Sequence, residues 1–326
     1  MTSNSVLALA LAPAFALLPS AAAEESIPSP ATLCVVVGAP GEPELGSNFI
    51  QQAELWLKAG RQAGCRAITI GLETDQTNDL ARLKEAVSAE PKTGREEFWL
   101  VLIGHGTFDG KDARFNLRGP DLSATDLAQW LQPFQRPLAI IDTASASAPF
   151  LNRLSGTNRV VISATRSGHE VNFTRFGQYL AEAISDPQAD LDKDGAVSLL
   201  EAFLWASRRT GEFYKSEGRL ASEHALIDDN GDGLGTQADW FRGLRAVKKA
   251  KEDAAVDGLL AQQFRLVPSE ADSKLSPEQR SRRDTLERAV FAYRDRKGQM
   301  PEAEYYRELE KLLLELARVY GDQDQQ

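Results

Sequence analysis

The chain has 326 residues, of which 26% are charged and 42% hydrophobic, as is typical of a soluble globular protein. This composition excludes a disordered chain, a collagen and a disulfide-rich miniprotein, and the length suggests about two domains. With 37 basic and 47 acidic side chains the net charge is −10, so the chain lacks the basic surface expected of a nucleic-acid-binding protein. Excess carboxylates keep a protein in solution, and they can also be calcium ligands.

Residues 1–23 have the features of a signal peptide. The stretch 6–18 is apolar but too short for a comfortable membrane span, and Ala21 and Ala23 fit the small-x-small cleavage pattern before Glu24. No Lys or Arg precedes the apolar stretch, which leaves the α-amino group as its only positive charge. We expect a secreted or periplasmic protein without a membrane span after cleavage. The alternative is an uncleaved anchor or a disordered leader.

Residues 32–182 alternate between predicted strands and helices. The expected strands are 33–38, 67–71, 98–104, 137–142 and 159–164, and the expected helices are 47–63, 78–89 and 122–131. The pair Asp109-Gly110 predicts a hairpin within 108–117. This alternation indicates an α/β/α sandwich around a parallel sheet, in which ligands bind beyond the carboxyl ends of the strands.

The only two cysteines, Cys34 and Cys65, each lie at the start of a predicted strand. If these strands are parallel neighbours, the two thiols would lie near the same end of the sheet. An oxidising compartment would then permit a disulfide. Two unreactive core thiols are the equally weighted alternative.

Polar residues follow the third and fourth predicted strands, which end in Gly104-His105-Gly106 and in the segment 143–148, TASASA. This order resembles the caspase/metacaspase/legumain clan of cysteine peptidases, in which one strand ends in His-Gly and the next in Asp/Glu-Ala-Cys-x-Ser-Gly. The resemblance implies a caspase-like fold over 32–182. Aligned position by position, Ser145 stands in the place of the cysteine. A register shifted by one would put Ala144 there and keep Asp142 as the acid.

The absence of a cysteine in this segment makes peptidase activity unexpected. A thiolate is nucleophilic near neutral pH, whereas a serine hydroxyl needs a base hydrogen-bonded to it. In the first alignment Thr143 also replaces the family's acid, and Ala148 its glycine. We therefore expect an inactive domain with a binding or scaffolding role. The alternative is a calcium-dependent hydrolase or peptidase with Ser145 as nucleophile, His105 as base and the Gly106 N–H as oxyanion donor.

Residues 190–201, DLDKDGAVSLLE, match an EF-hand calcium loop at every diagnostic position. Carboxylates occupy positions 1, 3 and 5, glycine position 6 and glutamate position 12. Amphipathic helices are expected before and after this first loop. A solvated acidic turn is the alternative. The predicted ligands are Asp190, Asp192, Asp194, Ala196 through its carbonyl, Ser198 and Glu201.

Residues 228–239, DDNGDGLGTQAD, form a second and less complete match. Glycine replaces the apolar residue at position 8, and an aspartate replaces the longer glutamate at position 12, so we expect weaker calcium binding. The loop starts are 38 residues apart, which favours a helical EF-hand pair over 174–248 with either structural or sensor sites. The predicted ligands are Asp228, Asn230, Asp232, Leu234 through its carbonyl, and Asp239.

The C-terminal part of the chain reads as helical. A charged helix is expected over 240–264, and a helical hairpin over 271–326, with Ser276-Pro277 opening its first helix. Apolar residues recur at spacings of four and three along 305–319, as on one face of a helix. This face could bind a protein partner, or it could pack within the chain's own hairpin, which we favour.

Overall fold

The computed structural model describes residues 30–73, 78–294 and 296–321. The predicted signal peptide, 1–23, lies outside these residues. In the part that is described, no helix combines the length and the apolar character needed to cross a membrane.

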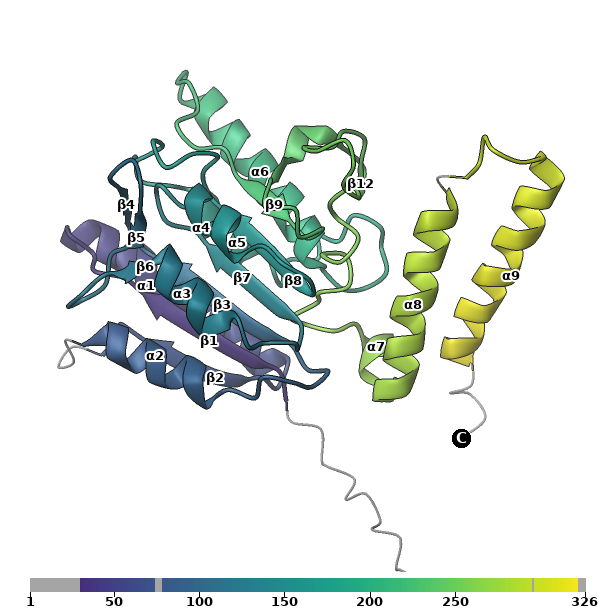
Figure 1. Ribbon diagram of the computed structural model, residues 1–326, viewed down its shortest axis with the longest axis horizontal. Helices are drawn as coiled ribbons and strands as arrows, with labels where there is room; N and C mark the ends of the chain where they lie inside the picture. Colours follow the sequence, from purple (N-terminus) through teal and green to yellow (C-terminus); the bar gives the residue numbers. More distant parts are fainter. Residues whose placement is uncertain (1–29, 74–77, 295, 322–326) are drawn as a thin grey trace, which may run out of the picture.

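A seven-stranded sheet forms the centre of the molecule, in the order β10-β9-β8-β7-β3-β1-β2 (Figure 1). Five neighbouring strands of this sheet, β2, β1, β3, β7 and β8, are parallel. β9 and β10 continue the sheet in antiparallel pairing. The expected α/β class and its five parallel strands are confirmed. The bounds are β1 Thr32–Val37, β2 Arg66–Ile70, β3 Phe98–Ile103, β7 Leu138–Asp142, β8 Arg159–Ser163, β9 Leu226–Asp228 and β10 Thr236–Gln237.

The central strands are apolar throughout because both of their faces are covered. In β1, Leu33 and Val35 belong to one hydrophobic cluster, and Cys34 and Val36 belong to the other. Helices α1 (Pro43–Gln62), α5 (Phe176–Ala183) and α6 (Leu199–Ser216) pack in the first cluster. Helices α2 (Asp79–Ala89), α3 (Ala124–Leu131) and α4 (Ala148–Leu154) pack in the second, which completes a three-layered sandwich.

The predicted hairpin lies beside the sandwich as part of a small antiparallel sheet. It consists of β4 (Gly106–Phe108) and β5 (Ala113–Phe115), and β6 (Leu122–Ser123) pairs with β5. Strand β4 begins at the glycine of the His-Gly pair, so the hairpin fixes the backbone next to the candidate site.

The region after α6 differs from the helical pair that the sequence suggests. Leu226 and Ile227 are buried and extend the central sheet as β9, so the second acidic loop lies between two strands rather than two helices. The second acidic loop and the α/β domain therefore share one sheet instead of meeting at a domain boundary near residue 182.

The expected helix over 240–264 is also wrong. A short 3₁₀ helix η1 (Ala238–Trp240), a hairpin of β11 (Phe241–Arg242) and β12 (Arg245–Ala246), and irregular turns replace it. The backbone has a φ of 59° at Gly243 and 106° at Gly258, a conformation that glycine permits and that ends helical continuity.

The C-terminal hairpin is confirmed. It comprises α8 (Pro277–Arg294) and α9 (Glu302–Gly321), preceded by the single turn α7 (Glu270–Ser273). Ser276 and Gln279 exchange the two hydrogen bonds of a capping box at 2.8 and 3.2 Å. Leu286 and Val319 pack between the two helices, which stand beside the sandwich in Figure 1.

Candidate functional site

The ends of β3 and β7 meet as the sequence suggests. Leu102 is paired with Asp142 in parallel register, which brings the His-Gly turn and the segment 143–148 together. The Ser145 Oγ accepts a hydrogen bond from the Gly106 N–H at 3.1 Å and donates to the Gly106 carbonyl at 3.1 Å. Ser145 is 3% exposed, so this hydroxyl is enclosed by protein.

His105 lies in the same turn but faces other partners. Its Nε2 is 3.2 Å from the Pro40 carbonyl oxygen, and its ring meets those of Phe49 and Phe173 edge to face. Within the described residues no hydrogen bond joins His105 to Ser145. The Gly106 N–H, the predicted oxyanion donor, already donates to Ser145 Oγ.

The structure also distinguishes the two alignments of the segment. Ala144 is 1% exposed and packs in the hydrophobic cluster with α4, whereas Ser145 faces the His-Gly turn. A Cβ on Gly106 would lie 2.2 Å from the Ser145 carbonyl oxygen, so glycine alone fits there. The position-by-position alignment, with Ser145 beside the turn, is the one that the packing supports.

Asp142, the last residue of β7, is a buried carboxylate with one partner. Its Oδ1 accepts the Ala144 N–H at 3.0 Å, and its Oδ2 is buried without a hydrogen bond from any described residue. Burial raises the pKa of this carboxyl to about 7. Asp142 therefore titrates near neutral pH, and among the described residues no hydrogen bond joins its carboxylate to His105.

Cys34 and Cys65, the predicted disulfide candidates, are both free thiols in this structure. Cys34 packs in the hydrophobic cluster of one sheet face, and Cys65 packs against the cluster of the opposite face. Burial raises the thiol pKa of Cys34 to about 12 and that of Cys65 to about 11, so neither is a ready nucleophile.

The first acidic loop, 190–201, connects α5 to α6 as a compact turn. Carboxylate oxygens of Asp190, Asp192 and Asp194 lie within 4.8 Å of one another. The Asp190 carboxylate accepts the N–H of Lys193 at 2.7 Å and of Gly195 at 3.2 Å, which draws the loop around it. Lys193 and Gly195 both have positive φ, of 64° and 91°.

The end of the first loop is closed by Glu201. Its Oε2 accepts the Ser198 N–H at 2.8 Å while the Ser198 Oγ accepts the Glu201 N–H, a capping box that opens α6. Partial burial and the charges of Asp194 and Glu201 raise the pKa of Asp192 to about 6. Several carboxylate oxygens close together are the ligands that Ca²⁺ prefers.

The second acidic loop, 228–239, repeats this arrangement at its start. The Asp228 carboxylate accepts the N–H of Gly231 at 3.0 Å and of Gly233 at 2.8 Å, and Asn230 Oδ1 accepts the Asp232 N–H at 2.8 Å. The Asp232 Oδ2 is buried and has no hydrogen-bond donor among the described residues. A buried carboxylate oxygen without a partner fits a bound cation.

The second loop is held against α4. The Asn152 side chain donates to the Gly233 carbonyl at 2.7 Å, and the Gly233 N–H donates to Ser155 Oγ at 3.0 Å. Asp239, the predicted last ligand, is exposed in η1. Asp257, which sequence analysis missed, is 2% exposed and contacts the loop backbone. No spacing rule relates residue 257 to a twelve-residue loop that ends at 239.

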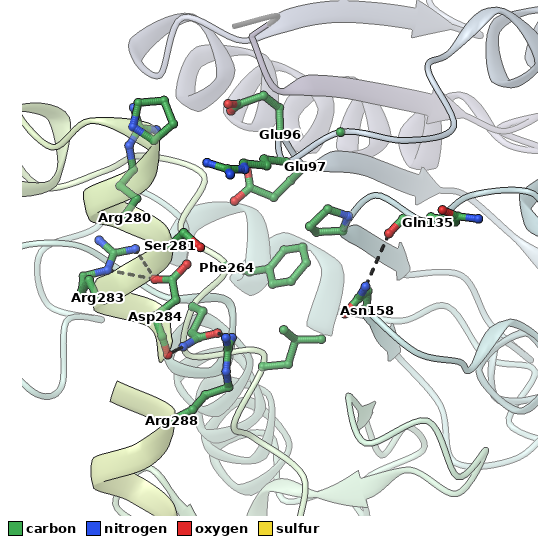
Figure 2. A pocket seen from close by; sticks show the side chains of 16 residues that line it. Glu96, Glu97, Gln135, Asn158, Phe264, Arg280, Ser281, Arg283, Asp284 and Arg288 are labelled. Carbon is green, nitrogen blue, oxygen red and sulfur yellow. Dashed lines mark hydrogen bonds and ion pairs between the residues drawn. The ribbon is translucent and has the colours of Figure 1, made fainter. Parts of the chain in front are cut away.

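A pocket of about 320 Å³ lies at the amino ends of β3 and β7, whereas the candidate site lies beyond their carboxyl ends. Figure 2 shows this pocket from close by. Glu97 and Pro137, which precede β3 and β7, line it from the sandwich, and Arg283 and Asp284 line it from α8. The Gln263 side chain donates to the Asp284 carbonyl at 2.6 Å across this region. Since the hairpin supplies one wall, the pocket is part of the hairpin's contact with the sandwich.

Comparisons with known proteins give distant structural similarity. No protein-family model and no curated protein match the sequence. The chain is similar to the Drosophila initiator caspase Dronc with a TM-score of 0.41 and 13% identity, over 64% of this chain and 83% of that one. It is similar to a Geobacter sulfurreducens protein with a TM-score of 0.40 and 12% identity, over 64% of this chain and 98% of that one.

Proposed function

We propose that this chain is a calcium-binding protein built on a caspase-like α/β domain that has no peptidase activity. The observation that carries the calcium proposal is the cluster of Asp190, Asp192 and Asp194, whose oxygens lie within 4.8 Å of one another at the positions of an EF-hand loop. The buried Asp232 Oδ2 without a partner supports a second ion.

Each loop has residues that would hold the ion. In the first loop, carboxylates of Asp190, Asp192 and Asp194 would bind it, together with Glu201 at the end of the loop. In the second loop, Asp228, Asn230 and Asp232 would do so. Bound Ca²⁺ supplies positive charge where like-charged carboxylates converge, and it thereby stabilises both turns.

The contacts of Ser145 support the proposed lack of peptidase activity. A serine nucleophile needs its hydrogen directed at a base, but the Ser145 hydroxyl donates to the Gly106 carbonyl. The lone pair of the same oxygen accepts the Gly106 N–H, which occupies the donor that an oxyanion would need. A hydrolase would have to break both contacts before it could react.

Calorimetry tests the calcium proposal. Chelator-treated full-length protein titrated with CaCl₂ should show binding, and Asp190→Ala combined with Glu201→Gln should abolish the tighter component, because two ligands of the first loop are lost. The exposed Asp253→Asn is a matched control for loss of charge and should bind as the unaltered protein does. Identical binding isotherms for the double variant and the unaltered protein would refute the first site.

We also propose export, on the basis of the apolar segment and the small residues before Glu24. Mass spectrometry of the natively expressed protein should find Glu24 at the N-terminus. A protein that retains Ser5 to Ala23 in the cytoplasm would contradict this proposal.

A further inference from the structure

Glu201, the last residue of the first loop, closes the loop through hydrogen bonds to its beginning and its end. Its Oε1 accepts the N–H of Leu191 at 2.8 Å and of Asp192 at 3.2 Å, which are loop positions 2 and 3. Its Oε2 accepts the N–H and the hydroxyl of Ser198, loop position 9, both at 2.8 Å. One carboxylate therefore joins the start of the loop to its last turn.

In the second loop the same three positions are joined by a residue outside the loop. The Asp257 Oδ1 accepts the N–H of Asp229 at 3.0 Å and of Asn230 at 3.2 Å, which are positions 2 and 3. Its Oδ2 accepts the hydroxyl of Thr236, position 9, at 2.6 Å. The pattern repeats that of Glu201 although Asp257 comes from a later segment.

Asp239 does not have these contacts. It is exposed in η1, and its carboxylate has no hydrogen bond to the loop in the part of the chain that the structure describes. Asp239 therefore stands at position 12 of the second loop in the sequence, but Asp257 makes the contacts that the residue at position 12 makes in the first loop.

A reciprocal contact holds Asp257 in this place. The Asp229 Oδ1 accepts the Gly258 N–H at 2.8 Å, and its Oδ2 accepts the Ala261 N–H at 2.7 Å. Each aspartate thus binds the backbone next to the other. Gly258, with a φ of 106°, permits the turn that directs Asp257 toward the loop.

The charge in this region points to a cation. Asp228 is 1% exposed and Asp257 is 2% exposed, and the Asp232 Oδ2 is buried without a partner. Burying carboxylates without a compensating positive charge is costly. A calcium ion bound by these carboxylates would offset that cost, as it would in the first loop.

We infer that Asp257, and not Asp239, is the carboxylate that completes the second calcium site. This assignment rests on the proposed calcium binding and adds to it the ligand set of the second loop: Asp228, Asn230 and Asp232 from the loop, closed from outside by Asp257.

Calorimetry with CaCl₂ on full-length protein tests the assignment in the Asp190→Ala/Glu201→Gln background, where the second site alone remains. Adding Asp257→Asn should weaken binding at least tenfold, since even residues that only orient metal ligands contribute about 10–100-fold. Adding Asp239→Asn should leave the binding constant unchanged. Asparagine keeps the size of aspartate, and its Oδ1 can accept the two backbone N–H bonds, so circular dichroism in chelator should be unaltered.

Hydrogen exchange in the same background gives a second measurement that needs no change at residue 257. Calcium should slow exchange of the amides at 229–230 and 258–261, which the two aspartates hold. The assignment would be overturned if Asp239→Asn weakened calcium binding and Asp257→Asn did not. It would also be overturned if calcium protected the amides at 238–240 from exchange but not those at 258–261. A background that binds no calcium would refute the second site itself, and unaltered protein that binds none would refute the proposed function.

Discussion

At the scale of single residues, Ser145 shows why a match in sequence does not establish a catalytic pair. The residue lies beside the His-Gly turn, as the alignment requires, but its hydroxyl is bound to backbone on both sides. The His105 imidazole packs edge to face against the rings of Phe49 and Phe173, and its Nε2 lies 3.2 Å from the Pro40 carbonyl oxygen. The His-Gly turn and the segment 143–148 lie side by side, but the hydrogen bond between Ser145 and His105 that a serine nucleophile needs is not made.

Alkylation of Ser145→Cys tests this geometry. Because the position is enclosed and not bonded to imidazole, the thiol should react with iodoacetamide at pH 7 at least about tenfold more slowly than an exposed thiol. Thr107→Cys, exposed in β4, is the matched control, in a background with Cys65→Ser. Rapid alkylation that His105→Ala suppresses would instead show a thiol–imidazole pair and restore the hydrolase interpretation.

Asp142 gives a prediction about pH. Its pKa in the folded protein is about 7, above its ordinary value of 3.8, so the folded state holds a proton that the unfolded state releases. The free energy of unfolding should therefore fall as the pH rises from about 4 to 7. Above pH 7, Asp142 is ionised in both states and should cause no further change.

Asp142→Asn should remove this loss. The variant should exceed the unaltered protein in free energy of unfolding by about 2–4 kcal/mol at pH 8 and by little at pH 4. Urea unfolding at several pH values in the presence of chelator measures the difference. The exposed Asp253→Asn should show no such trend, and a difference for Asp142→Asn that is constant with pH would contradict the prediction.

At the scale of secondary-structure elements, the sequence predicted the helices and strands whose formation depends on residues close together in the chain. The apolar strand at 98–104 and the helices at 78–89 and 122–131 were predicted, because burial on both faces of a strand and the side-chain caps Asn78 and Ser123 act within a few residues. The hairpin at Asp109-Gly110 followed for the same reason.

The errors lie where distant residues decide the structure. β9, only Leu226–Asp228, is a strand because it pairs with the edge of β8, and no periodicity in three residues could show this. Charged residues over 240–264 suggested a helix, but Gly243 and Gly258 adopt positive φ. Asp257 contacts the second loop only after this irregular segment has folded back, so the spacing of residues within the loop could not point to it.

The C-terminal hairpin is tied to the preceding turn by a buried ion pair. Arg283 of α8 binds Asp272 of α7, and both side chains are 6% exposed. The Tyr320 hydroxyl of α9 donates to the same carboxylate at 3.2 Å. Asp272 therefore joins three helices.

Arg283→Ala should loosen the hairpin by about 3–5 kcal/mol, because it leaves the Asp272 carboxylate buried without its cation. Amide exchange along α9 should accelerate by about 100-fold or more if these amides exchange through that opening. Arg282→Ala is the control: its pair with Glu315, 3.8 Å apart, has side chains 65% and 46% exposed and should contribute less than about 1 kcal/mol. Equal acceleration in both variants would contradict a special role for Asp272.

At the scale of the whole molecule, one irregular segment joins the two acidic loops. Asp257 contacts the second loop, and the carbonyls of Ala261 and Phe264 accept the first free N–H groups of α6. Arg265 binds the Asp194 carboxylate of the first loop at 2.7 Å. Under the proposed function, calcium at either loop would therefore stabilise a segment that contacts the other.

Calcium should raise the thermal midpoint of the full chain relative to chelator. Each site saturated at 100 times its dissociation constant adds about 2.7 kcal/mol to the free energy of unfolding. Because Asn152 and Ser155 hold the second loop, protection from hydrogen exchange should also extend into α4. Scanning calorimetry and exchange with and without calcium measure both effects, and an unchanged midpoint would contradict them.

The two loops differ in how much of the chain each needs before it is complete. The first loop contains its own closing residue, because Glu201 lies within the same twelve residues. On the proposed assignment, the second site needs a carboxylate 29 residues beyond Asp228, and Asp257 reaches the Asp229 N–H only when the segment between them has turned back. A chain interrupted near Gly243 would contain the proposed carboxylates of the first loop but lack Asp257, so calcium at the second site would distinguish finished molecules from partial ones.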